Sequence, residues 1–520
     1  MSVDVSKIGG IGAYYYENCK KHGDKVYIIN EKTGEKVTYN EYLTYAIRIA
    51  LRLQEIGVGE GDVVVFCSNN CIDAVTIPLA ILLLGAIAAP VGSDYLDKYK
   101  EAFLVWTKPK VLFCDQPNER FFRQLIEKNN LETKVFVFES SLYIELKSKH
   151  NEEDNFIPFN VEKPYETIAI IICTSGSTDN FKAVNMLHGT SLDYQKQYLE
   201  SEKFLDVALI NFPYVAGSGI LIGSLVSCVG GTVVLLANFS IQNCVKTIHN
   251  FKVTHLRVIP EMLLSIARSS LLDKYSLASV KYICVYGSPI FRSQIQECQK
   301  KFTNAYIMNT YGCLEAPTIF KFDIEDGKDY ILSKGDSVGK LWRKDVEVKL
   351  IDPETGKEVK KPERGELYVR GKQLFNGYYK NPEATKKFLD EDGWFRTGDL
   401  GYFDEDDCLY ILGRKEIVLN INGSKKISPT EIERVVVEHP AVSACCVIGI
   451  QKNQLDEPMA VIMKKPGVQA TEDDIIKFVK ERLPEEKQLK YVAFVKDFPR
   501  TPVGKIRVAE VRSRFNNKPM

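Results

Sequence analysis

The stretch TIAIIICTSGSTDNFKAV, residues 167–184, joins an apolar run to a segment of small and hydroxyl-bearing residues. The run 167–173 is mostly β-branched, which predicts a buried strand. In residues 174–184, backbone N–H groups and hydroxyls can surround phosphate oxygens, and Lys182 adds a positive charge. Such turns are also common without any function, and the GxxxxGK[ST] spacing of a Walker A loop is absent. We expect the next segment, 185–200, to be a loop that leads into a helix.

Short apolar runs of the same kind alternate with amphipathic segments along the first half of the chain. The predicted strands are 62–69, 110–115, 167–173, 208–213, 232–237, 254–260 and 280–287, and helices are expected at 41–57 and 244–253 among others. This alternation predicts an α/β fold of stacked parallel sheets covered by helices. The longest apolar stretch, 74–91, contains two prolines and a glycine, so it is read as a buried helix followed by a buried strand.

The pattern of apolar and polar residues changes after residue 330. Residues 345–371 predict short antiparallel strands joined by turns, as in a small β-barrel-like subdomain. From residue 416 onward a helix at 428–439, a strand at 444–450 and a helix at 471–483 are predicted, with Ser428 and Glu431 forming a capping box. We therefore divide the chain into a large N-terminal domain, 1–415, and a small mobile α+β domain, 416–520.

The overall composition indicates which partners and which cellular compartment to expect. The 520 residues include 68 basic and 68 acidic side chains, so charge does not indicate a nucleic acid or an anionic membrane as partner. The thirteen cysteines are an odd number without CxxC pairs, which favours a reducing cytoplasm over a disulfide or zinc framework. The N-terminus lacks the pattern of a signal peptide. We expect a cytoplasmic protein without membrane insertion, either a monomer or a homodimer.

Four further motifs follow the phosphate-type loop in the chain. They are NTYGCLEA at 309–316, GELYVRG with GYYKNPEAT within 365–385, GWFRTGDLGYFDEDDCLYILGRKE at 393–416, and PRTPVGKI at 499–506. In this order they resemble the adenylate-forming enzymes, which comprise acyl-CoA synthetases, luciferase-like proteins and peptide-synthetase adenylation domains. The resemblance covers essentially the whole chain and is closest in pattern to acyl- or aryl-CoA ligases.

The resemblance implies a two-step reaction. ATP and Mg²⁺ would activate a small carboxylic acid to an acyl-adenylate with release of pyrophosphate, and a pantetheine thiol would then take the acyl group. CoA is the expected thiol, with the phosphopantetheine of an acyl or peptidyl carrier protein as the alternative acceptor. The first step depends mainly on positioning and charge neutralisation.

The same resemblance assigns roles to individual residues. Lys505 would bridge the substrate carboxylate and the α-phosphate, with Lys182 as a second catalytic lysine. Glu315 would be the carboxylate ligand of Mg²⁺, which needs few protein ligands. Asp399 would accept hydrogen bonds from both ribose hydroxyls. The other nucleotide-binding positions are Thr174, Ser175, Gly176, Ser177, Thr178, Gly287, Ser288, Pro289, Tyr311, Ile411 and Arg414.

For two of these residues a structural role is the alternative. Tyr311 is expected to stack on adenine, but it could equally be a core aromatic residue. Lys505 could be a solvated surface lysine, which is the commonest place for a lysine. The motif around Lys505 favours the catalytic role.

Three departures from the family pattern bear on activity. Residues 179–183 read Asp-Asn-Phe-Lys-Ala where the family has Gly-x-Pro-Lys-Gly, so Asp179 brings a negative charge near the expected pyrophosphate. Leu314 replaces a threonine whose hydrogen bond to a charged group would contribute about 1.5–3 kcal/mol. Glu416 stands at the hinge position, where Lys or Asp is usual. Slow adenylation is expected, and a non-catalytic nucleotide-binding protein is the alternative.

The acid and the thiol are less well defined by the sequence. NFPYVAGSG at 211–219 lies where the family builds its acyl pocket, with Tyr214 near a gating position and Gly217 leaving room. Because the Phe-Asp signature for an amino group is absent, an aryl or medium-chain acid is favoured over an amino acid. Lys425 and Lys426 could contact CoA phosphates or an acidic carrier protein, or could be solvated surface charges.

Overall fold

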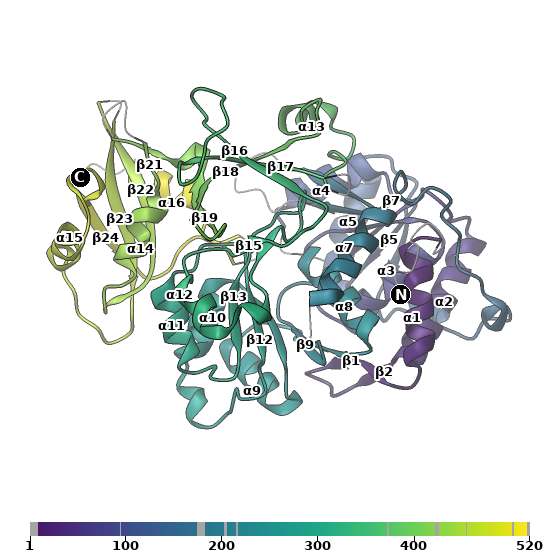
Figure 1. The fold of residues 1–520 in the computed structure, drawn as a ribbon. Helices are drawn as coiled ribbons and strands as arrows, with labels where there is room; N and C mark the ends of the chain where they lie inside the picture. The colour runs from purple at the N-terminus through teal and green to yellow at the C-terminus, as the bar shows by residue number, and fades with distance from the viewer. Residues whose placement is uncertain are drawn as a thin grey trace.

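The computed structural model describes residues 9–93, 95–173, 182–201, 205–214, 217–371, 374–421, 426–453, 455–501 and 504–516, with only the backbone of 217 and 218. The chain folds into a large N-terminal part and a small C-terminal part that lies against one side of it (Figure 1). The family-type fold of mixed α/β sheets is therefore confirmed.

Two mainly parallel sheets form the large part, as the alternating strands and helices predict. The first has the strand order β13-β12-β11-β9-β10-β1-β2, and β2 is antiparallel to β1. Its strands are β1 (Val26–Asn30), β2 (Lys36–Thr38), β9 (Val207–Ile210), β10 (Thr232–Leu235), β11 (His255–Val258), β12 (Tyr282–Val285) and β13 (Tyr306–Asn309). The strands predicted at 208–213, 232–237, 254–260 and 280–287 are confirmed.

The second sheet has the order β6-β5-β3-β4-β7-β8. Its strands are β3 (Val63–Cys67), β4 (Ile87–Pro90), β5 (Val111–Cys114), β6 (Lys134–Val137), β7 (Ile168–Cys173) and β8 (Ala183–Leu187). The expected loop at the start of 185–200 is wrong, because β8 runs antiparallel to β7 and Cys173 pairs with Ala183. Residues 174–182 thus connect two neighbouring strands, and the helix begins only at His188.

Helices cover these sheets and supply most of the apolar core. They are α1 (Ile11–His22), α2 (Tyr39–Glu55), α3 (Ile72–Leu83), α4 (Asp97–Thr107), α5 (Gln116–Lys128), α6 (Ser141–Leu146), α7 (His188–Ser201), α8 (Gly217–Val229), α9 (Ile241–Phe251), α10 (Pro260–Ala267), α11 (Arg292–Gln299) and α12 (Lys328–Ser333). In α3 every residue except Asp73 is buried, and β4 follows it, as predicted for 74–91. Each large apolar side chain buried there contributes about 1.5–3 kcal/mol.

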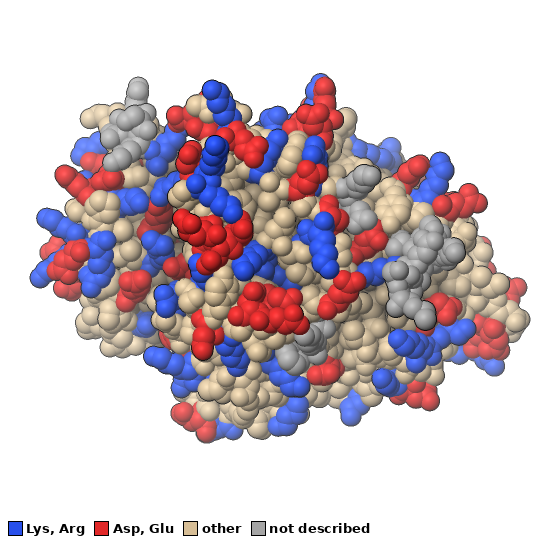
Figure 2. All heavy atoms as spheres, in the orientation of Figure 1, with Lys and Arg blue, Asp and Glu red and all other residues tan. Residues whose placement is uncertain are grey.

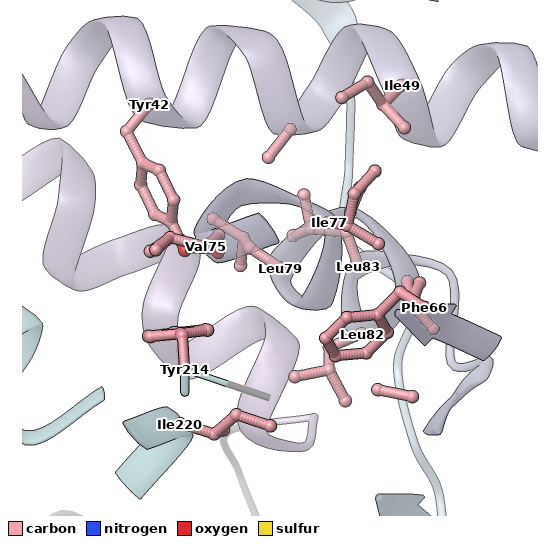
Figure 3. Close-up of a cluster of buried hydrophobic side chains, with 14 of the residues drawn as sticks. Tyr42, Ile49, Phe66, Val75, Ile77, Leu79, Leu82, Leu83, Tyr214 and Ile220 are labelled. Atoms are coloured by element: carbon pink, nitrogen blue, oxygen red, sulfur yellow. Dashed lines mark hydrogen bonds between the residues drawn. The ribbon is translucent and has the colours of Figure 1, made fainter. Parts of the chain in front are cut away.

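Figure 3 shows the packing of this core, with Tyr42 and Ile49 of α2 above Val75 and Leu79 of α3. No helix in the described part of the chain has both the length and the apolar composition needed to cross a membrane. On the face drawn in Figure 2, basic and acidic side chains are interspersed, in keeping with equal numbers of each in the sequence.

A four-stranded antiparallel sheet and the small domain complete the chain. The sheet contains β16 (Glu347–Ile351), β17 (Gly365–Arg370), β18 (Phe395–Phe403) and β19 (Leu409–Arg414), which agrees with the antiparallel strands predicted after residue 330. β14 (Phe320–Lys321) pairs with β15 (Lys340–Leu341), and α13 (Pro382–Phe388) lies beyond β17. The small domain holds β20 (Leu419–Asn420), β21 (Lys426–Ile427), β22 (Val442–Lys452), β23 (Leu455–Lys464), β24 (Tyr491–Val495), α14 (Pro429–Val436), α15 (Glu472–Lys480) and α16 (Val508–Asn516).

Polar contacts join the small domain to the large one. Ser428 and Glu431 form the predicted capping box at the start of α14. Glu431 also accepts hydrogen bonds from Arg364 in the large domain, at 2.7 and 3.0 Å. Lys426 pairs with Glu354 at 2.8 Å, so in this arrangement its ammonium group contacts the large domain. Lys425 lies outside the described residues.

Candidate active site

A cavity of about 240 Å³ opens where the carboxyl ends of the parallel strands meet the small domain. Its walls include Ile259, Tyr286 and Thr310, which directly follow or adjoin the ends of β11, β12 and β13, and helix α7 closes another side. In open α/β sheets ligands bind outside the carboxyl ends of the strands, so the position of this cavity marks it as the candidate active site.

Lys505 of the small domain reaches into this cavity. It packs on Gly287, where the Cβ of any larger residue would lie 2.8 Å from Lys505 Cε and 3.3 Å from its Nζ. Burial lowers the pKa of Lys505, the nearby Arg414 lowers it further, and Asp399 and Glu261 oppose the shift. The domain arrangement therefore brings a residue near the end of the chain to the ends of the parallel strands.

Lys505 can occupy this position because Gly287 has no side chain. The backbone of Gly287 has φ +88°, a conformation that L side chains rarely adopt.

We expect Gly287→Ala to displace the flexible end of Lys505 and to lower the rate of acid-dependent pyrophosphate release by about 10-fold or more, since about 1 Å of misplacement can cost 100-fold in rate. The measurement is steady-state pyrophosphate release, with a melting temperature recorded alongside. Gly327→Ala is the matched control, because its φ is +81° and open space surrounds it. Equal rates for the two variants would contradict the expectation.

Asp399, Tyr311 and Arg414 form one group near Lys505, joined by an ion pair and a hydrogen bond. Asp399 and Arg414 pair across the β18–β19 hairpin, with Arg414 Nε 3.2 Å from Asp399 Oδ1. The hydroxyl of Tyr311 donates to Asp399 Oδ2 at 2.6 Å. Burial raises the pKa of Asp399, while Arg414 and the Tyr311 hydroxyl oppose that rise. The structure thus brings three of the predicted nucleotide-binding residues together.

Tyr311 is half-buried, and its ring centroid lies 6.2 Å from that of Phe320. Ile411 packs against the same apolar cluster from β19. These contacts suit both interpretations of Tyr311, so stacking on adenine stays a prediction.

Lys182, Glu315 and Tyr378 form a second polar group. The hydroxyl of Tyr378 donates to Glu315 Oε1 at 2.7 Å, and Glu315 lines the cavity. The ammonium of Lys182 lies 3.7 Å from the ring centroid of Phe388 and 4.8 Å from that of Tyr378. Burial lowers the pKa of Lys182, and the negative charge of Glu315 opposes that shift. A lysine and a carboxylate thus stand together at the end of the phosphate-type loop.

Other predicted site residues fall at different places. Thr174, Ser175, Gly176, Ser177, Thr178 and Asp179 lie outside the described residues. Ser288 and Pro289 follow Gly287 but line a second cavity, between the two domains. Glu416 is exposed in the short helical turn Lys415–Ile417, which connects β19 to the small domain. Leu314 lines the active-site cavity, and its side chain packs against apolar neighbours.

The position of Tyr214 differs from the expected one at the acyl pocket. Its side chain is buried in the core near Val75 and Ile220, as Figure 3 shows, and does not belong to the cavity lining among the described residues. Gly219 and Gly223 of α8 make room for this packing, because a Cβ at either would lie within 2.8 Å of Tyr214 atoms. The wall on this side is formed by Ile220, Leu221 and Ser224. Gly217 begins α8 next to this wall.

Two buried arginines in the cavity wall, Arg257 on β11 and Arg343 after β15, are not among the residues predicted from the sequence. A signal for Arg257 was present, because a charged residue inside an otherwise apolar strand is costly unless it is partnered. Glu261 and Glu433, which face each other across the domain interface, were also missed.

The interdomain cavity, of about 180 Å³, holds this carboxylate pair together with Arg268 and Arg500. Burial raises the pKa of Glu433 to about 7, and the negative charge of Glu261 adds to the rise while the N–H of Val447 opposes it. The pKa of Glu261 is also raised by burial, and its Oε2 is buried without a hydrogen-bond partner. Arg268 is held by Glu297, at 2.7 and 2.9 Å.

This pair predicts a pH-dependent stability. Folded Glu433 keeps a proton that the unfolded chain releases near its ordinary pKa of 4.5, so its stabilising contribution is lost as pH rises from about 4.5 to 7. The effect is on the order of 3 kcal/mol, at about 1.4 kcal/mol for each unit of the pKa difference. We expect the melting temperature to fall between pH 5 and pH 8, and to fall less in Glu433→Gln. The exposed Glu438→Gln is the control, and an identical pH dependence of wild type and Glu433→Gln would contradict the assignment.

The geometry and the comparisons with known proteins agree on the class. A two-domain α/β fold in which a lysine of the small domain enters a cavity beside the Asp399–Tyr311–Arg414 group is the arrangement expected of an adenylate-forming enzyme. The profile of the AMP-binding enzyme family matches residues 15–379, and that of the AMP-binding enzyme C-terminal domain matches residues 431–505. The chain therefore belongs to the AMP-binding enzyme family and is an AMP-forming acid–thiol ligase.

Individual relatives cover nearly the whole chain. 4-Coumarate–CoA ligase 1 of Arabidopsis thaliana is 27% identical over 522 residues, which cover 97% of this chain and 92% of the relative. The corresponding ligase of Narcissus pseudonarcissus is 28% identical over 518 residues, covering 97% and 93%. The ATP-bound structure of MatB from Rhodopseudomonas palustris has a TM-score of 0.87 at 24% identity, covering 98% of this chain and 99% of that one. The amide bond synthetase McbA of Marinactinospora thermotolerans has a TM-score of 0.86 at 23% identity, covering 96% and 99%. These two likenesses bear on the fold alone.

Proposed function

We propose that this enzyme activates a small carboxylic acid with ATP and transfers the acyl group to the thiol of CoA. The observation that carries the proposal is the contact of Lys505 with Gly287, in one cavity with Glu315 and beside the Asp399–Tyr311 pair. The relatives named 4-coumarate–CoA ligase support CoA as the acceptor.

The first step forms an acyl-adenylate. A carboxylate oxygen of the acid attacks the α-phosphorus of ATP, the bond from that phosphorus to the bridging oxygen breaks, and pyrophosphate leaves. The ammonium of Lys505 stabilises the negative charge as it moves between the two groups. Asp399 accepts hydrogen bonds from the ribose hydroxyls, since an ionised carboxylate has acceptor sites beyond those that Tyr311 and Arg414 use.

The second step forms the thioester. The sulfur of CoA attacks the acyl carbon, the bond to the phosphate oxygen of AMP breaks, and AMP leaves while the thiol proton passes to solvent. We place the rotation of the small domain that would admit the thiol at the connection around Glu416, which is exposed. Hinges require backbone freedom more than a particular side chain.

Glu315 is the residue that would hold Mg²⁺. Tyr378 occupies only its Oε1, and Mg²⁺ binds nucleotides through phosphates and waters with one or two protein carboxylates. The described residues contain no group of three or more potential metal ligands. Glu315 alone is therefore the protein ligand to be tested. Bound Mg²⁺ supplies charge neutralisation of the phosphate oxygens, and Lys182 adds a further positive charge nearby.

We place the reaction in the cytoplasm. All thirteen cysteines are described and none of them forms a disulfide, as suits a reducing compartment. We expect the enzyme to be a monomer or a homodimer.

Pyrophosphate release with ATP, Mg²⁺ and a panel of aromatic, fatty and amino acids tests the proposal, with and without CoA. Acid-dependent release together with an acyl-CoA product supports it. Release without any CoA product would favour loading of a carrier protein instead. ATP binding without release for any acid would indicate a non-catalytic nucleotide-binding protein, and recovery in an Asp179→Gly/Leu314→Thr variant would trace the loss to those two residues.

A further inference from the structure

Two buried arginines stand in the wall of the active-site cavity, away from the predicted nucleotide contacts. Arg257 of β11 is 5% exposed, and Arg343, which follows β15, is 1% exposed. Charged side chains are almost never fully buried unless a partner compensates the charge. The partners of these two guanidinium groups therefore indicate what the cavity is built to receive.

Among the described residues, the partners of Arg257 are neutral. Its Nη1 donates to the hydroxyl of Tyr198 at 3.0 Å, and its guanidinium carbon lies 5.4 Å from the ring centroid of Tyr286. Its Nε is buried without any acceptor. No carboxylate among the described residues lies within 4.0 Å of Arg257. The positive charge is thus left for a ligand to compensate.

Arg343 adds a donor to the same wall. Its Nε and Nη2 donate to the two carboxylate oxygens of Asp345, at 2.7 and 2.5 Å, so its own charge is compensated. Its Nη1 is buried and has no acceptor. Both arginines act on one phenol: burial raises the pKa of Tyr194 to about 12, and the charges of Arg257 and Arg343 oppose that rise. The guanidinium carbon of Arg343 lies 5.4 Å from the ring centroid of Tyr194, and that ring lies 5.8 Å from the ring of Tyr198, the hydrogen-bond partner of Arg257. The two guanidinium groups therefore lie on the same side of the cavity.

Two smaller polar atoms of the lining also lack partners. They are Ser191 Oγ on α7 and Asn185 Oδ1 on β8, both buried. Ile172, Ile220 and Phe375 are among the apolar residues of the same wall, and Glu315 and Lys505 are its other charged residues. Buried polar groups without a partner in the wall of a ligand cavity are candidate positions for hydrogen bonds to a substrate.

We infer that the acid activated by this enzyme carries a second carboxylate, which binds Arg257 with Arg343 and Ser191 as further donors. The inference rests on the proposed function, because it names the substrate of that same site: a dicarboxylic acid with an apolar body. A guanidinium fork matches the planar geometry of a carboxylate and can donate two hydrogen bonds to it. Tyr286 connects the two ends of the cavity, since its ring packs near Arg257 and the next residue, Gly287, contacts Lys505.

The test compares each dicarboxylic acid with its own monomethyl ester. The panel holds straight-chain dicarboxylic acids of increasing length and terephthalic acid. Two readouts are taken: kcat/KM for pyrophosphate release, and equilibrium binding by calorimetry in the presence of α,β-methylene ATP, which cannot release pyrophosphate. We expect at least one diacid to exceed its ester by about 100-fold in both readouts, because a buried charge pair is lost in the ester.

Arg257→Gln and Arg257→Lys identify the residue responsible. Arg257→Gln keeps a hydrogen-bond donor for Tyr198 but loses the charge, so the preference for the diacid should disappear while the ester changes by less than about 3-fold. Arg257→Lys should retain part of the preference and shows that loss of folding is not the cause. Arg123→Gln, an exposed arginine of α5, is the matched control.

The outcomes separate this inference from the proposed function. If the enzyme activates the esters and other monocarboxylic acids as efficiently as the diacids, the inference of a second carboxylate is wrong, and the proposed ligase activity is supported. If diacids bind in an Arg257-dependent way but no acid releases pyrophosphate, the anion site stands and the proposed function fails. If no diacid binds wild type more tightly than its ester, the inference is overturned whatever the activity.

Discussion

Lys505→Ala should lower acid-dependent pyrophosphate release by about 10²- to 10³-fold, the usual cost of removing one group that stabilises transition-state charge. The lysine lies in the cavity, against Gly287, and within electrostatic reach of Asp399. Because it acts on charge that moves during the reaction, the loss should fall on kcat, and the affinity for ATP should change little. Rates measured at saturating ATP, with ATP binding measured separately, check both parts.

Two further variants sharpen this experiment. Lys505→Arg keeps the charge, but a planar guanidinium presents its donors in a different geometry from that of an ammonium group, so we expect little rescue. The exposed Lys496→Ala in the same domain controls for the loss of a lysine. A Lys505→Ala enzyme that retains more than about half of the wild-type rate would show that the ammonium is a packing feature and not a catalytic group.

Asp399→Asn should raise the KM for ATP by about 10- to 150-fold, because hydrogen bonds to a charged group contribute about 1.5–3 kcal/mol. The substitution keeps the shape of the side chain but removes the negative charge that Arg414 and Tyr311 contact. The ribose should be the part of ATP that is affected. Replacing ATP by 2′-deoxy-ATP should therefore cost wild type much more than it costs Asp399→Asn.

This pairing of variant and nucleotide works as a thermodynamic cycle, which isolates the contact between Asp399 and the ribose. Asp392→Asn, an exposed aspartate that precedes the same strand, is the control. Equal losses with 2′-deoxy-ATP in wild type and in Asp399→Asn would assign Asp399 to a structural role.

The fold followed closely from local patterns. The centres of the runs 62–69 and 232–237 are apolar because both faces of a parallel sheet are covered, and their short length favours strands over helices. β8 was missed because its five residues, AVNML, include the polar Asn185 and run directly into helix α7, so no turn signal marks the end of the strand.

The site was predictable to the extent that its residues lie in ordered motifs. Asp399 and Arg414 lie in one motif and Lys505 in another, and only the order of the motifs along the chain indicated that the three residues meet. Arg257 belongs to no motif, and its importance depends on what surrounds it in three dimensions. Tyr214 was misplaced for a similar reason, since the space left by Gly219 and Gly223 is a property of packing.

The hairpin formed by β7 and β8 has a consequence for how this enzyme can diverge. Cys173 and Ala183 are paired neighbours, so the segment 174–182 leaves and re-enters the sheet on adjacent strands, about 5 Å apart. Changing the length of a connection between such fixed anchors costs little closure entropy. We therefore expect substitutions between Cys173 and Ala183, at Asp179 for example, to leave the stability of the sheet unchanged.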